Sequence, residues 1–229
     1  MDGLNTLSNI LFWFASLSDF LGLTIVFISL IIKKYQNDKP PFVNWIFIFY
    51  TIFYILTVLT TLFSILEKHN NWIYNILPIL ITIPLFFFFQ GLHTSKSLKL
   101  FNSVYVFIYL LGAVFFWENI FQTFLNPLFY LLFSFYVLIN SVGFLNEELS
   151  SMRSQNIFAK IEFWFIACLF FYSTLNVLVW SLFEYSAAKA AEGSEFIGPG
   201  GLWLFGHNSI LFIQSLVFSV AVFKTDRIK

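Results

Sequence analysis

An all-α bundle of membrane-spanning helices is the fold class that this sequence predicts, from its composition, its hydropathy and the spacing of its polar breaks. The 229 residues are 59% hydrophobic and only 10% charged, whereas a soluble globular domain carries about 25% charged residues. The mean hydropathy is +0.82. The longest polar stretch, residues 184–201, is too short for a soluble domain, so the chain is predicted to be a single integral membrane domain over residues 1–229.

Seven apolar segments are long enough to cross a bilayer, since about 20 helical residues at about 1.5 Å each match a hydrocarbon core of about 30 Å. Polar residues at 118–119 and 126–127 separate the fourth segment from the fifth, which predicts a tight hairpin or, alternatively, one re-entrant segment. Pro78 and Pro84 in the third each remove an intrahelical hydrogen bond, which predicts a kink and carbonyl groups in need of partners. The predicted spans are 9–32, 43–66, 72–92, 101–121, 125–145, 161–183 and 202–223.

The basic residues predict the orientation of these seven spans. Ten of the twelve fall on one side, and only Lys68 and Lys189 fall on the other. Because cytoplasmic loops carry an excess of lysine and arginine, we expect the N-terminus outside and the C-terminus in the cytoplasm. The ten are Lys33, Lys34, Lys39, Lys96, Lys99, Arg153, Lys160, Lys224, Arg227 and Lys229.

Asp19 lies near the middle of the first predicted span, where a carboxylate costs on the order of 2.5–3.5 kcal/mol on insertion scales. Its helical face also carries Ala15, Ser16 and Gly22, and small residues let a neighbouring helix approach closely. We therefore expect Asp19 to be buried in the bundle, either as a functional group or as a hydrogen-bonded packing group.

Further polar side chains gather in the predicted outer half of the membrane. In the seventh span His207, Leu211 and Gln214 fall on one helical stripe. Glu118 and His207 also fit an interfacial position, because each lies within about two turns of a span end. The pattern predicts an outward-facing ligand pocket lined by Asp19, Asn75, Glu118, Asn176, His207 and Asn208.

The sequence does not indicate an enzyme. A zinc site needs several converging ligands, but only one of the three histidines, His207, falls within a predicted span, and Cys168 is the single cysteine. A serine hydrolase needs a nucleophile beside its base, and His207 and Ser209 point to different sides of a helix. No Gly-x-Ser-x-Gly elbow and no phosphate-loop or dinucleotide motif occurs. We expect no catalytic residue, no cofactor and no metal.

Three short motifs carry a resemblance to a known group. They are Asn70-Asn71-Trp72-Ile-Tyr-Asn75, Phe171-Tyr-Ser-Thr-Leu-Asn176, and Trp203 followed by His207-Asn208-Ser209-Ile210. Together they resemble a poorly characterised group of seven-helix bacterial membrane proteins, members of which tend to accompany sensor histidine kinases. The chain departs from that pattern at Ile81-Thr82, where a glutamate would be expected. The resemblance implies a sensory or accessory membrane module and no established activity.

The expected function is that of a non-enzymatic sensory or accessory module in the cytoplasmic (inner) membrane of a bacterium, crossing it several times. Because no soluble output domain is present, a signal has to pass through another membrane or cytoplasmic protein, and nucleic acid is not an expected partner. The bilayer itself is the other expected partner. Two alternatives remain open at this point: a structural subunit of a larger membrane or envelope complex, and a small-solute carrier.

Overall fold

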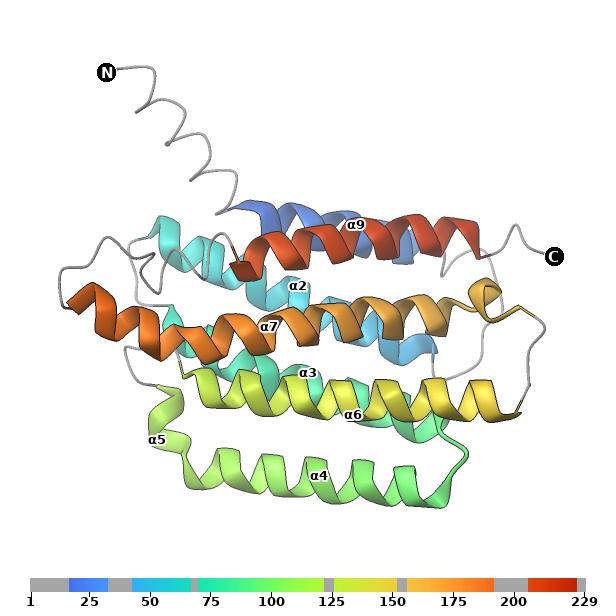
Figure 1. Cartoon of the computed structure of the whole chain (residues 1–229). Helices are drawn as coiled ribbons and strands as arrows, with labels where there is room; N and C mark the ends of the chain where they lie inside the picture. Colours follow the sequence, from blue (N-terminus) through green and yellow to red (C-terminus); the bar gives the residue numbers. More distant parts are fainter. Residues whose placement is uncertain are drawn as a thin grey trace.

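The computed structural model describes residues 17–32, 43–66, 70–121, 126–151, 156–191 and 206–225, and these residues form helices and no strand (Figure 1). Six of the helices are long and apolar enough to cross a membrane, and Leu17–Ile32 is a shorter apolar helix that precedes them. The others, in order, are α2 (Val43–Ile65), α3 (Asn71–Leu92), α4 (Lys96–Phe115), α5 (Trp117–Ile120), α6 (Pro127–Ser151), the 3₁₀ turn η1 (Ile157–Ala159), α7 (Ile161–Ala191) and α9 (Ser209–Lys224).

The predicted spans match these helices in number and order, but several ends are corrected. The fourth long helix, α4, begins at Lys96, five residues before the predicted start of the fourth span. Helix α6 continues through Ser151, six residues beyond the predicted end of the fifth span at 145. Helix α7 extends to Ala191, beyond the predicted end at 183. The alanine-rich stretch there has high helix propensity, which continues the helix past the apolar segment. Residues 9–16 and 202–205 of the first and last predicted spans lie outside the described part.

Helices α4 and α6 each have the length of a full span and pack against each other, as the hairpin interpretation requires (Figure 1). The short helix α5 follows α4 at the end of the bundle, and residues 122–125 are outside the description. The re-entrant alternative would need a single excursion that returns to the same side. Two full-length antiparallel helices favour the hairpin.

Successive long helices run in opposite directions, with α4 at one edge and α9 beside Leu17–Ile32 at the other (Figure 1). This alternation places Lys96 and Lys99 at the start of α4, Lys160 before α7 and Lys224 at the end of α9 at the same end of the bundle. We call this the basic end and the other the far end. Lys189 lies at the far end, so the described lysines follow the predicted separation.

The outer surface of the bundle is apolar, as expected of helices that face lipid. On α4 the exposed side chains include Phe107 at 68%, Val114 at 68% and Phe115 at 77%. Soluble proteins rarely expose contiguous apolar surface of this kind. The interior is aromatic as well: Phe165 contacts Phe49 and Phe218 through tilted and edge-to-face rings at 5.5–5.6 Å between centroids. The chain is therefore a multi-pass helical membrane bundle.

Gly22 lies where the Leu17–Ile32 helix meets α9, and this contact bears out the predicted close approach. A Cβ atom built on Gly22 would lie 3.1 Å from the Cα of Phe212 and 3.1 Å from the Cβ of Ser215. On α4, by contrast, a Cβ on Gly112 would meet nothing within 4 Å.

The two glycines therefore predict opposite responses to the same substitution. Gly22→Leu should lower the free energy of unfolding by about 1–3 kcal/mol, because the added side chain forces the two helices apart. Gly112→Leu should be neutral or stabilising, since leucine has the higher helix propensity and open space is available. Chemical unfolding of both variants in the same detergent micelles measures the difference. Equal losses at the two positions would show that the helices do not approach at Gly22.

Candidate functional site: a buried histidine cluster

His207 lies at the start of α9, in a turn of π-helical geometry that covers residues 206–208. Such turns occur frequently at functional sites. Gly206 lets this turn approach α7, since a Cβ on it would lie 3.0 Å from a Val179 methyl carbon. The His207 side chain is consequently buried between α7 and α9, with 2% of its surface exposed.

The hydrogen bonds of His207 determine which ring nitrogen carries the hydrogen. Nδ1 lies 2.6 Å from Oδ1 of Asn176, and the Asn176 amide nitrogen donates to the Tyr172 carbonyl at 2.8 Å, which fixes the amide orientation. The Asn176 oxygen can only accept, so Nδ1 must donate. In the neutral ring Nε2 is then the acceptor, and it faces the Tyr172 hydroxyl at 3.5 Å, a distance too long for a strong hydrogen bond. The Asn176 contact therefore selects the tautomer of His207 with hydrogen on Nδ1.

Aromatic rings enclose the imidazole on three sides. The ring centroids of Tyr172, Tyr130 and Trp180 lie 5.5, 5.9 and 6.1 Å from that of His207. Tyr130 and Trp180 also stack on each other at 4.4 Å. We refer to Tyr130, Tyr172, Asn176, Trp180 and His207 as the His207 cluster.

Tyr130 ties this cluster to α3 through a carbonyl that a proline has released. Pro78 has no N–H to donate to the carbonyl of Tyr74, four residues before it. The Tyr130 hydroxyl donates to that carbonyl at 2.9 Å. For Pro78, the predicted need for a carbonyl partner is met by a side chain from α6.

Tyr130→Phe should therefore cost about 1–3 kcal/mol in the free energy of unfolding, because the Tyr74 carbonyl loses the hydrogen bond from the Tyr130 hydroxyl. Tyr109→Phe is the matched control. Its hydroxyl donates to the Phe129 carbonyl at 3.1 Å, but that carbonyl lies inside α6, where the N–H of Phe133 also serves it, so the cost should be smaller. Unfolding titrations of both variants test the difference. A Tyr109→Phe loss as large as that of Tyr130→Phe would exclude the released carbonyl as the cause.

Asp19 is buried at the same end of the bundle, with 6% of its surface exposed. One of its carboxylate oxygens accepts the Phe20 N–H at 2.7 Å. It also lies close enough to Tyr74, Tyr130 and Tyr172 for an electrostatic interaction with each. The carboxylate is thus sheltered from lipid inside the bundle.

The other predicted site residues are placed less uniformly. Asn208 follows His207 in the same turn and is 2% exposed. Asn75 is fully buried, but its amide donates to the Ile120 carbonyl at 3.1 Å and accepts the Asn126 N–H at 2.8 Å, so it holds the backbone on either side of the α5–α6 connection. Glu118 is exposed on α5. All six predicted residues lie toward the far end, and ligand binding by them stays a prediction.

A second polar cluster, at the basic end, was missed by the sequence analysis, which placed His93 simply in a loop. His93 follows α3, is 1% exposed, and lies with Nδ1 2.9 Å from Glu147 Oε2 and Nε2 3.1 Å from Asn140 Oδ1. The Asn140 amide nitrogen donates to the Tyr136 carbonyl at 2.9 Å, so its oxygen faces His93. The Asn140 oxygen can only accept, so Nε2 donates to it, while Nδ1 faces the Glu147 carboxylate.

One sequence signal for this cluster existed. Asn140, Gly143 and Glu147 share one face of α6 at spacings of three and four, and a Cβ on Gly143 would lie 3.5 Å from the His93 ring. The other oxygen of Glu147 accepts from the Thr94 backbone and hydroxyl at 3.0 Å each and from the Ser95 N–H. Glu147 therefore joins α6 to the connection between α3 and α4.

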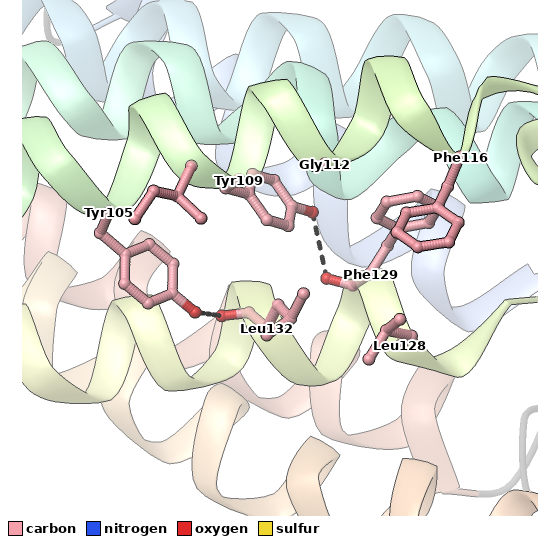
Figure 2. A pocket seen from close by; sticks show the side chains of 8 residues that line it. Tyr105, Tyr109, Gly112, Phe116, Leu128, Phe129 and Leu132 are labelled. Carbon is pink, nitrogen blue, oxygen red and sulfur yellow. Dashed lines mark hydrogen bonds between the residues drawn. The ribbon is translucent and has the colours of Figure 1, made fainter.

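Two grooves of similar volume lie between pairs of neighbouring helices. Between α4 and α6, Tyr105, Tyr109 and Gly112 help to line an apolar groove of about 300 Å³ (Figure 2). Both tyrosine hydroxyls there are committed to α6 carbonyls, Tyr105 to Leu132 at 2.8 Å. Between α7 and α9, a groove of about 290 Å³ is lined in part by Tyr172 of the His207 cluster. In the described ranges no group of three His, Cys, Asp or Glu side chains could hold a metal ion.

The fold and the buried clusters define an integral membrane helix bundle with a polar centre at the far end. No protein-family model, no curated protein and no solved structure matches the chain.

Proposed function

We propose that the protein is a non-enzymatic sensory or accessory module of the cytoplasmic membrane, which binds a ligand beside the His207 cluster and acts through a partner protein. The observation that carries the proposal is the state of His207. Asn176 holds its Nδ1–H, so Nε2 of the neutral ring is a buried acceptor that faces the Tyr172 hydroxyl at 3.5 Å. A ligand with a hydrogen-bond donor would replace the Tyr172 hydroxyl at Nε2.

Asp19 supplies the second element of the proposed site. A buried ionisable residue within a membrane span is a functional candidate by default, and this one lies within electrostatic range of Tyr172. A carboxylate and an imidazole acceptor suit a ligand that carries hydrogen-bond donors. In the proposed orientation the far end faces outside.

Transmission to a partner follows from the architecture. The described chain offers lipid-exposed helix faces, above all α4, and the short connections at the basic end, where Lys160 pairs with Glu148 at 2.8 Å. A ligand that changes the packing of α7 against α9 would alter these surfaces without any chemistry. Any structural signal must then be taken up by another protein.

The experiment is native mass spectrometry of the full-length tagged protein, extracted from its own membranes in lipid nanodiscs. The proposal expects a stoichiometric partner protein and a bound small molecule. Asp19→Asn should lose the small molecule and keep the partner, whereas Glu118→Gln, the same change at an exposed carboxyl, should keep both. A wild-type protein without partner and small molecule would overturn the proposal, as would an Asp19→Asn variant that retains the small molecule.

A further inference from the structure

The groove between α7 and α9 lies on the apolar outer surface of the bundle. Its rim consists of exposed apolar side chains on the two helices: Phe171 is 65% exposed, Leu175 41%, Ile213 61% and Val217 45%. In Figure 1 the two helices lie side by side, with α9 at the edge of the bundle. A molecule dissolved in the bilayer can therefore reach the groove laterally.

The wall of this groove contains a buried amide without a partner. Gln214 is 6% exposed, and its side-chain oxygen has no hydrogen-bond partner in the described part of the chain. It lies near the middle of the span Gly206–Lys224, where water is not available to it. Leaving a buried amide oxygen unsatisfied is unfavourable, so a hydrogen-bond donor that reaches Gln214 is favoured.

The polarity of the side chains that line the groove determines which kind of ligand can bind there. None of the residues that line the groove is charged, and its polar side chains are Tyr172, Gln214 and the thiol of Cys168. An ion would be desolvated here without compensation, whereas a neutral hydroxyl would exchange hydrogen bonds with the amide. The ligand that fits is neutral and mostly hydrocarbon.

The length of the ligand follows from a second groove. Val217 also lines an apolar groove of about 410 Å³ that contains Val220 and ends at Lys224. From Gln214 to Lys224 the helix rises by about 15 Å, at about 1.5 Å per residue. A hydrocarbon tail can therefore lie along α9 toward the basic end while its head stays at Gln214.

We infer that the α7–α9 groove is a binding site for a neutral long-chain lipid alcohol, which enters from the bilayer, donates its hydroxyl hydrogen to the Gln214 amide oxygen and lays its chain toward Lys224. This site is separate from the proposed ligand site at Asp19 and His207. The Tyr172 side chain contacts both sites, so a ligand bound in the groove would change the environment of His207.

The test uses two photoreactive probes on the full-length protein in nanodiscs: a diazirine-bearing hexadecanol with the diazirine next to the hydroxyl, and the matching hexadecane. Peptide mapping by mass spectrometry should find the alcohol on α7 and α9 around Ile213 several-fold more often than the alkane. The α4–α6 groove is the internal reference, because its hydroxyls are already committed, and both probes should label it equally (Figure 2). Equal labelling of the α7–α9 groove by both probes would overturn the inference.

Gln214→Leu provides the second arm. It should reduce labelling by the alcohol to the level of the alkane, and it should leave the unligated protein at least as heat-stable as wild type, because an unpaired buried amide has been removed. Unchanged labelling by the alcohol in this variant would refute the site at Gln214. If Gln214→Leu instead lowered the melting temperature, the amide would have a structural partner and the inference would fail on that ground. If the inference about the groove failed, the Asp19→Asn experiment that tests the proposed function would not be affected.

Discussion

Replacing His93 by leucine is expected to lower the free energy of unfolding by about 3–5 kcal/mol, the cost of breaking a buried ion pair by removing one partner. His93 has a side chain with no exposed surface and pairs with Glu147 at 2.9 Å. Leucine would fill part of the space but would remove the hydrogen-bond partner of Glu147 Oε2 and of the Asn140 oxygen. Denaturant titration in detergent micelles, followed by circular dichroism, measures the loss.

Lys160→Met is the matched control for His93→Leu. Lys160 pairs with Glu148 at 2.8 Å, but its side chain is 34% exposed, and ion pairs of this kind contribute about 0–1 kcal/mol. The two substitutions remove the partners of neighbouring glutamates on the same helix, and the two pairs differ in burial. A Lys160→Met loss equal to that of His93→Leu would show that burial is not the deciding factor.

Trp180→Ala is expected to cost about 3–5 kcal/mol, the usual range for truncating a fully buried tryptophan. Trp180 is 1% exposed and stacks on Tyr130 at 4.4 Å. Its loss opens a cavity beside His207 and removes the surface that holds Tyr130 toward the Tyr74 carbonyl. The same unfolding titration applies, and ligand retention in the nanodisc experiment should fall with it.

Trp117→Ala serves as the control for the tryptophan. Trp117 is 52% exposed on α5, and substitutions of exposed residues are usually within about 0.5 kcal/mol of neutral. A small Trp180→Ala effect, comparable with that of Trp117→Ala, would mean that the His207 cluster is not tightly packed and could not position a ligand.

Much of the fold could be predicted from the sequence. The thickness of the hydrocarbon core sets the length of each spanning helix, and the lack of water there requires every backbone N–H and C=O group to be hydrogen-bonded within the helix. Helix ends were less predictable. Helix α6 runs on through Ser151 and α7 to Ala191, where local helix propensity and not apolarity decides. The prediction of which face of the first helix packs against a neighbouring helix was correct at Gly22. A small residue at helical spacing directly indicates that another helix approaches closely there.

The polar contacts were only partly predictable. Helical periodicity predicted that Asn176 and His207 both face the predicted pocket. In the structure the two side chains do meet, with His207 Nδ1 2.6 Å from Asn176 Oδ1, although 31 residues separate them in the sequence. Asn75 looked like a pocket residue because it is polar and inside a span, yet its amide serves the backbone of a distant connection. The pairing of His93 with Glu147 spans 54 residues and depends on how α3 and α6 are placed, which periodicity does not encode.

The proposed site depends on which nitrogen of the His207 ring carries hydrogen. Nitrogen-15 solid-state NMR of histidine-labelled protein in bilayers measures this directly. Signals are assigned by replacing each of the three histidines in turn. We expect His207 to show a hydrogen on Nδ1 and none on Nε2. A His207 ring with hydrogen on Nε2 would contradict the account, because no acceptor would then be available for the ligand.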